Sequence, residues 1–217
     1  APNQGIEEGQ VDETAVRRRI REACEGSLER LDTDWIDLYQ LHAVPHKWAM
    51  PAVMETLGAL KQEGKVRWYG ISINDRAAID KLRALGPIDV LQIGYNLIER
   101  DADELLHWAK AQEIGTLIRV PLAKGWLSGN YHGPNAKSLT KEDVRFVRFN
   151  RPESVDALKK LPQLDFIAQP DRTMAQAALR FVLDHPGVSC VIAGAKNREQ
   201  IEENVAACDV APLSDGE

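Results

Sequence analysis

His42 is the first residue whose type and position in the sequence point to chemistry. It follows the segment 35–41, which is largely apolar and comes directly after a helical pattern. Alternate residues of a β-strand share a face, so Leu38, Gln40 and His42 would point the same way. We therefore expect a short buried strand that holds an imidazole rigidly at its carboxyl end, as a candidate catalytic group. A hydrogen-bonded structural histidine is the alternative.

Polar side chains also occur late in three further strand-like segments. Ser72 ends the segment 66–72, Gln92 lies within 89–95, and Arg119 lies near the end of 116–120. Taken singly, Ser72 and Gln92 are explained as structural residues and Arg119 as an internal ion-pair partner. If these strands are parallel neighbours, however, their polar ends converge on one rim, and that convergence favours a binding or catalytic site.

Two loops combine glycine with lysine, at 121–130 and at 193–200. Glycine lets the backbone approach a ligand closely, and the second loop leads into the start of a predicted helix. This combination is typical of phosphate binding, and barrel proteins often bind phosphate after their last two strands. An ordinary glycine-rich turn is the alternative for each loop.

The periodicity of apolar residues predicts alternating strands and helices. Strands are predicted at 35–41, 66–72, 89–95, 116–120 and 188–193, and helices at 12–31, 51–63, 74 or 75 to 85, 101–114, 153–168, 173–185 and 197–208. A long polar insertion is expected at about 124–150. Expected helix starts are an N-cap at Asp12 and capping boxes at Asp101 with Glu104 and at Thr173 with Gln176.

Strand followed by helix, five times, predicts βα units and a parallel sheet in one domain, 1–217, without an internal boundary. A TIM barrel and a doubly wound sheet are the two candidates. No GxGxxG motif follows the first strand, which argues against a dinucleotide-binding Rossmann unit. A TIM barrel closes with eight strands and has a typical length of about 250 residues, so the chain supplies only part of one.

Composition excludes several classes of function. The 217 residues carry a net charge of −6, which gives no support for nucleic-acid binding. Three cysteines without a CxxC pair argue against a disulfide framework or zinc site and fit a reducing cytoplasm. No apolar run is long enough for a membrane span. His42 and His46 are separated by Pro45 and have no acidic neighbour, so no metal is expected. Trp48 and Trp126, on loops after strands, are candidate walls of a substrate pocket.

Five segments, in this order, resemble the aldo-keto reductase family. They are LDTDWIDLYQLH (31–42), GKVRWYGIS (64–72), LQIGYN (91–96), PLAKGWLSG (121–129), and IAGAK (192–196) running on to Glu203-Asn204. The resemblance covers nearly the whole chain. It implies an α/β fold, the (β/α)8 TIM barrel, and reduction of aldehydes or ketones to alcohols by hydride transfer from NADPH. A small carbonyl compound would be the substrate, with no metal, nucleic acid or membrane involved.

The resemblance also implies residue roles. His42 would orient the substrate carbonyl, and Ser72, Gln92 and Asn74 would hold the nicotinamide carboxamide. Arg119 stands where the family often has an aromatic ring against the nicotinamide, and a guanidinium can stack there as well. The other implied contacts to the cofactor are Val120, Pro121, Leu122, Ala123 and Lys124 at the pyrophosphate, Gly194, Lys196 and Gln200 at the 2′-phosphate, and Glu203 and Asn204 at the adenine.

Two departures from the family pattern affect these expectations. Lys196 favours NADP over NAD, but Ala195 and Gln200 replace the more polar or basic residues of some members. The family's catalytic Tyr, Lys and Asp belong to motifs on its first three strands, and the chain shows no counterpart. We therefore expect the C-terminal portion of a reductase, strands four to eight. The alternatives are an inactive nucleotide-binding regulatory subunit and a half-barrel completed by another chain.

Overall fold

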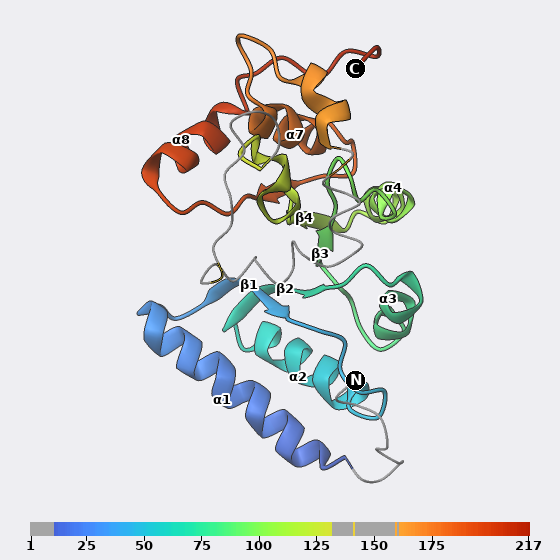
Figure 1. Cartoon of the computed structure of the whole chain (residues 1–217). Coiled ribbons are helices and arrows are strands. Elements are labelled where there is room, and N and C mark those ends of the chain that lie inside the picture. Colours follow the sequence, from blue (N-terminus) through green and yellow to red (C-terminus); the bar gives the residue numbers. More distant parts are fainter. Residues whose placement is uncertain (1–10, 132–140, 142–158, 160) are drawn as a thin grey trace. The chain divides into compact units, whose positions relative to one another are not determined.

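The computed structural model describes residues 11–131, 141, 159 and 161–217 (Figure 1). The chain forms two compact units. The first unit comprises residues 1–92 with 113–115, and the second comprises 93–112 with 116–217. The single-domain organisation expected from the sequence stays a prediction.

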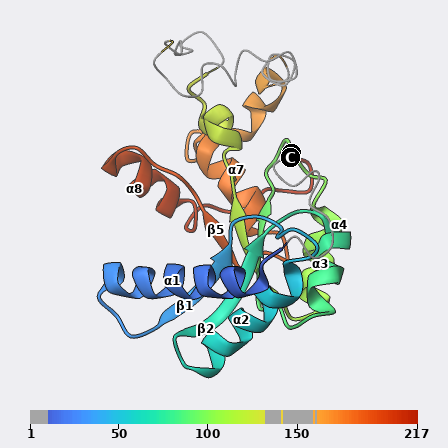
Figure 2. The same cartoon turned by 90° about the horizontal axis from the view of Figure 1, so that it is seen from below.

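The first unit begins with a long helix and continues with βα repeats. Its elements are α1 (Glu13–Leu31), β1 (Ile36–Leu41), α2 (Met50–Gln62), β2 (Val66–Ser72), α3 (Arg76–Arg83) and the start of β3 (Val90–Gly94). α1 lies beside α2 in both views (Figures 1 and 2). The predicted boundaries agree with these to within about two residues, the usual uncertainty at element ends.

Helix starts in the first unit follow the sequence signals. The Asp12 carboxylate accepts a hydrogen bond from the Ala15 amide at 3.0 Å, which confirms the predicted N-cap of α1. Asp75, one of the two residues proposed to begin α3, accepts from the amides of Ala77 and Ala78. These bonds satisfy amides that have no partner within the helix.

The strands of the first unit are parallel, as predicted. β1 pairs with β2 and β2 pairs with β3. Gly70 allows the second pairing, because a Cβ at this position would lie 2.2 Å from the carbonyl oxygen of Val90. Tyr69 and Ile71 are buried on one face of β2, whereas Trp68 on the other face is 54% exposed. One expectation was wrong: β1 is not a buried strand, since none of its six residues is fully buried.

The second unit contains the remaining elements. They are the end of β3, α4 (Asp103–Ala111), β4 (Gly115–Arg119, of which Gly115 belongs to the first unit), η1 (Ala123–Ser128), η2 (Leu161–Ile167), α7 (Met174–Leu183), β5 (Cys190–Ile192) and α8 (Arg198–Ala206). β4 and β5 are parallel neighbours. α7 packs against α8, η1, η2 and β5 and buries one face of small and aliphatic side chains.

One of the two predicted capping boxes in this unit is present. The Thr173 hydroxyl accepts from the Gln176 amide, and the Gln176 side chain accepts from the Thr173 amide. The box predicted at Asp101 and Glu104 was wrong, because α4 begins later, with Ala102 at the N-cap and no side-chain cap.

The insertion and the helix predicted at 153–168 are only partly described. The insertion opens as the 3-10 helix η1, and residues 132–140 and 142–150 lie outside the described part. Residues 153–158 and 160 also lie outside it, and Leu161–Ile167 is a 3-10 helix rather than the end of an α-helix. Among the described residues, no helix is both long and apolar enough to cross a membrane.

Candidate functional site

The first unit places two predicted cofactor residues side by side. Ser72 at the end of β2 pairs in register with Gln92 of β3, and the Ile73 amide donates to the Gln92 carbonyl at 3.0 Å. Both side chains are half-buried. A hydroxyl and a carboxamide at neighbouring carboxyl ends can hydrogen-bond a polar ligand group from one face of the sheet. Asn74 is exposed, two residues beyond the strand.

His42 lies at the same end of the sheet. It follows Leu41, which pairs with Ile71, so continuing the register by one residue sets His42 beside Ser72. The imidazole is exposed rather than packed in the core. Trp48 lies in the turn before α2, where the Lys47 ammonium stands 4.6 Å above its ring centroid. The structure thus leaves the predicted roles of His42 and Trp48 as predictions.

The second unit contains a cavity of about 470 Å³. Its wall includes most residues predicted at the phosphates and adenine: Val120, Pro121, Leu122, Lys124, Gly194, Lys196, Gln200, Glu203 and Asn204. These come from the turn after β4, the loop after β5 and the first two turns of α8. Segments about 70 residues apart in sequence therefore form one wall because β4 and β5 are parallel neighbours.

The turn after β4 has an unusual backbone. Val120 has φ 53°, Ala123 has φ 48° and Lys124 has φ 61°, all in the left-handed region. This region is rare for residues other than glycine and a genuine outlier for β-branched valine. Strained backbone of this kind gathers at ligand-binding sites. Ala123, predicted to contact the pyrophosphate, is buried beneath the turn and does not line the cavity.

The start of α8 forms another part of the wall of this cavity. The Asn197 side chain accepts from the Gln200 amide at 2.9 Å, and the Gln200 side chain accepts from the Lys196 amide at 2.8 Å. The Asn204 amide group donates to the Gly194 carbonyl at 3.5 Å. The amino terminus of a helix carries partial positive charge. With two lysines and one glutamate in its wall, the cavity suits an anionic ligand.

Besides Ala123, two predicted residues of this unit lie outside the cavity wall. The Arg119 guanidinium lies against Gly94, since a Cβ at that glycine would be 3.1–3.2 Å from three guanidinium atoms. Trp126 packs against an apolar cluster that includes Leu127, Leu161 and Ala178. The substrate-pocket role of Trp126 and the stacking role of Arg119 stay predictions.

Sequence reasoning also missed residues of the cavity wall. They are Gly125, Ser128, Asn130, Tyr131, Ala175, Ile192 and Ala195. Gly125, Ser128, Asn130 and Ala195 belong to the two loops predicted to bind phosphate but were not singled out, and Tyr131 lies in the predicted polar insertion. The glycines of 121–130 predicted a turn, but the sequence did not show which other segments would form a cavity with that turn.

A second polar cluster in this unit is formed by Asp103, His107 and His185, with ligand-type atoms all within 4.8 Å of one another. The Gly187 amide donates to His185 Nδ1 at 3.0 Å, so the neutral ring carries its proton on Nε2, which lies 3.3 Å from an Asp103 oxygen. A metal bound at Nε2 would need a lone pair on that atom, so the ring proton would have to move to Nδ1. Protonated Nδ1 could no longer accept the hydrogen bond from the Gly187 amide. Burial lowers the pKa of His185, so the neutral ring is favoured. We interpret the cluster as a hydrogen-bonding network.

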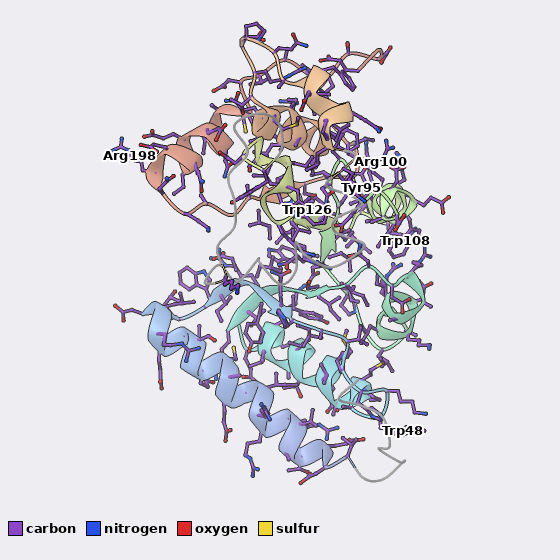
Figure 3. All side chains as sticks on the ribbon, in the orientation of Figure 1. Trp48, Tyr95, Arg100, Trp108, Trp126 and Arg198 are labelled. Carbon is purple, nitrogen blue, oxygen red and sulfur yellow. The ribbon has the colours of Figure 1, made fainter. Side chains whose placement is uncertain are left out.

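Tyr95 joins this cluster and gives a testable prediction (Figure 3). Burial, and the hydrogen bond from its hydroxyl to Asp103 at 2.9 Å, raise the pKa of Tyr95 to about 12. In the unfolded chain this tyrosine has its ordinary pKa of about 10, so above about pH 10 the unfolded chain loses the proton before the folded chain does. The free energy of unfolding should therefore fall between about pH 10 and pH 12. Phenolate absorbance should show a transition near pH 12 that Tyr95→Phe removes; its persistence in the variant would contradict the assignment.

Comparisons with known proteins agree with this architecture. The sequence model of the Aldo/keto reductase family matches residues 6–217. The chain is 34% identical over 198 residues to Aldo-keto reductase YhdN of Bacillus subtilis (strain 168), covering 87% of the chain and 58% of that protein. It is 31% identical over 205 residues to the NADH-specific methylglyoxal reductase of Escherichia coli (strain K12), covering 91% of the chain and 61% of that protein.

A solved structure shows the same fold. The glycerol dehydrogenase AKR11B4 from Gluconobacter oxydans superposes with a TM-score of 0.78 at 27% identity, covering 92% of the chain and 61% of that protein. The chain thus spans about six tenths of the length of the relatives it matches. Because the family model extends over nearly the whole sequence and the parallel βα units agree with it, the chain belongs to the aldo/keto reductase family.

Proposed function

We propose that this chain binds NADPH as part of a protein that reduces aldehydes or ketones to alcohols. The observation that carries the proposal is the cavity of the second unit, whose wall combines the strained turn after β4, the start of α8 and two lysines. Family membership supplies the reaction class, oxidoreduction with a nicotinamide cofactor. The preference for the phosphorylated cofactor and the carbonyl substrate are part of the proposal.

The residues present fit the phosphate and adenosine part of such a cofactor. Gly194 leaves open space, since a Cβ there would meet no atom within 4 Å. Lys196 and Gln200 would hold the 2′-phosphate, and Glu203 with Asn204 the adenine. The backbone from Val120 to Leu122, with Lys124, would hold the pyrophosphate. The two phosphate assignments pair an anionic group with cationic or amide donors.

Ser72, Asn74, Gln92 and Arg119 would hold and orient the nicotinamide, and His42 would orient the substrate carbonyl by a hydrogen bond. The bound cofactor supplies a hydride to the carbonyl carbon. Fixed hydrogen-bond donors would accelerate the reaction, because reactants held in one geometry lose less entropy on reaching the transition state.

A proton donor is needed to complete the reduction, and Tyr39, Tyr69 and Tyr95 are poor candidates for it. Burial raises the pKa of Tyr39, of Tyr69 and of Tyr95, which makes each a weaker acid. General acid catalysis contributes about 10²- to 10⁴-fold. We propose that the chain corresponds to strands four to eight of the family barrel and that the family's Tyr, Lys and Asp are supplied by another segment or another chain.

The same observation supports a second candidate, a regulatory subunit that binds the nucleotide without turnover. Two measurements separate the candidates and test the proposal. Titration with NADPH, followed by tryptophan fluorescence, should give a saturable change; its absence would refute both. Turnover on a panel of aldehydes, measured as NADPH oxidation, would support the reductase, whereas binding without turnover would support the regulatory subunit.

A further inference from the structure

Asn96 is a buried polar residue of the second unit to which no role has been assigned so far. It lies just beyond β3, and its side chain is 0% exposed. Buried amides are retained where all of their hydrogen bonds are made, since an unsatisfied one is costly. Its bonds therefore indicate what it does.

The two ends of the Asn96 side chain have different partners. Its oxygen accepts from the amides of Ile98 at 3.0 Å and Glu99 at 2.9 Å, which orders its own loop. Its nitrogen donates to the Glu99 carboxylate at 3.0 Å and to the carbonyl oxygen of Val120 at 3.2 Å. Only this last bond reaches another segment of the chain, 24 residues away.

The hydrogen bond from Asn96 reaches the strained turn at Val120, the residue of the turn for which a left-handed conformation is least favourable. Val120 is β-branched and has φ 53°. The same carbonyl also accepts from the Ala123 amide at 2.9 Å, which closes the turn. A carbonyl held by two donors cannot rotate away without losing both bonds. Asn96 therefore opposes relaxation of Val120 towards negative φ, and Val120, Pro121 and Leu122 line the cavity.

We propose that Asn96 is a positioning residue for the cofactor-binding turn: its amide holds the Val120 carbonyl and so fixes the turn against the pyrophosphate. The inference rests on the proposed function of the cavity. Asn96 does not line the cavity itself and acts only through Val120.

Asn96→Asp separates this role from the support of its own loop. An aspartate keeps both acceptor bonds from Ile98 and Glu99 but cannot donate to Val120 until it is protonated. The nearby Glu99 carboxylate would raise the pKa of the new carboxyl, since like charges disfavour ionisation. We expect NADP⁺ to bind N96D about tenfold more weakly than wild type at about pH 7.5, and most of that loss to be recovered at about pH 5.

Glu99→Gln is the matched control, because it keeps an acceptor for the Asn96 nitrogen and removes one charge from the same loop. Wild type and E99Q should bind NADP⁺ equally at each pH. Binding is measured by calorimetry on the whole chain, and urea unfolding checks that each variant is folded. The proposal would be overturned if N96D bound NADP⁺ as tightly as wild type at both pH values, or weakly at both. It would also be overturned if N96D failed to fold at both pH values, or if E99Q lost as much affinity as N96D.

Hydrogen exchange without ligand distinguishes failure of this inference from failure of the proposed function. The Ala123 amide should exchange faster in N96D than in wild type at about pH 7.5, because its acceptor is released. If wild type does not bind NADP⁺ but this difference is seen, the function is wrong and Asn96 still holds the turn. Unchanged exchange would show that Asn96 does not hold it.

Discussion

Lys196→Ala is expected to raise the Kd for NADPH about tenfold, equivalent to about 1.4 kcal/mol, and to leave the Kd for NADH nearly unchanged. The lysine lies in the cavity wall at the start of α8. An ammonium donates charge-assisted hydrogen bonds to a phosphate, and only NADPH carries the 2′-phosphate. Lys196 is exposed, so the effect should be largest at low ionic strength.

Arg198→Ala is the matched control for this prediction. Arg198 is two residues away, pairs with Glu202 at 2.7 Å, has an 89% exposed side chain and extends away from α8 (Figure 3). It removes the same charge without touching the cavity wall. Fluorescence titrations of both variants with NADPH and NADH provide the comparison. Equal losses for the two cofactors, or the same loss in R198A, would contradict a 2′-phosphate site at Lys196.

Gly70→Ala is expected to lower the free energy of unfolding by about 3 kcal/mol. The added Cβ would lie 2.2 Å from the Val90 carbonyl oxygen, closer than any non-bonded contact. Backbone cannot move aside as a flexible side chain can, so β2 and β3 would have to separate where Gly70 pairs with Val90. The midpoint of urea unfolding should fall accordingly.

Gly58→Ala should have the opposite effect in the same experiment. Gly58 lies inside α2, and a Cβ there would meet no atom within 4 Å. Alanine loses less backbone entropy than glycine in a helix, so the free energy of unfolding should rise by about 0.5–1 kcal/mol. Similar unfolding midpoints for G70A and wild type would show that the two strands do not approach as closely as described.

Much of the fold followed from local sequence signals. Alternating apolar residues predicted each described strand, and short polar side chains predicted the N-cap at Asp12, the alternatives Asn74 and Asp75 for the start of α3, and the capping box at Thr173. These features depend on residues within one turn of each other. The capping box at Asp101 is absent, because α4 begins at Asp103 with Ala102 at its N-cap, one residue beyond the position that the sequence signal marked.

The candidate site was predictable where residue types or family motifs marked it. The loops at 121–130 and 193–200 were recognised as phosphate-binding in type, and the structure brings both to one cavity. The packing of Trp126 against the cluster around Leu127 was not predictable, because an indole on a loop can contact solvent, a ligand or a core, and this cluster combines segments distant in sequence.

The sequence by itself determined the order of βα units, the family and the residue types available for chemistry. Tertiary structure alone decided that Val120 takes a left-handed conformation, that Asn96 holds its carbonyl and that Arg119 lies against Gly94. The reason is physical: periodicity and capping depend on neighbours in sequence, whereas strain and buried hydrogen bonds are set by contacts between segments. A β-branched residue keeps positive φ only where surrounding structure imposes it, and the sequence contains no local sign of that constraint.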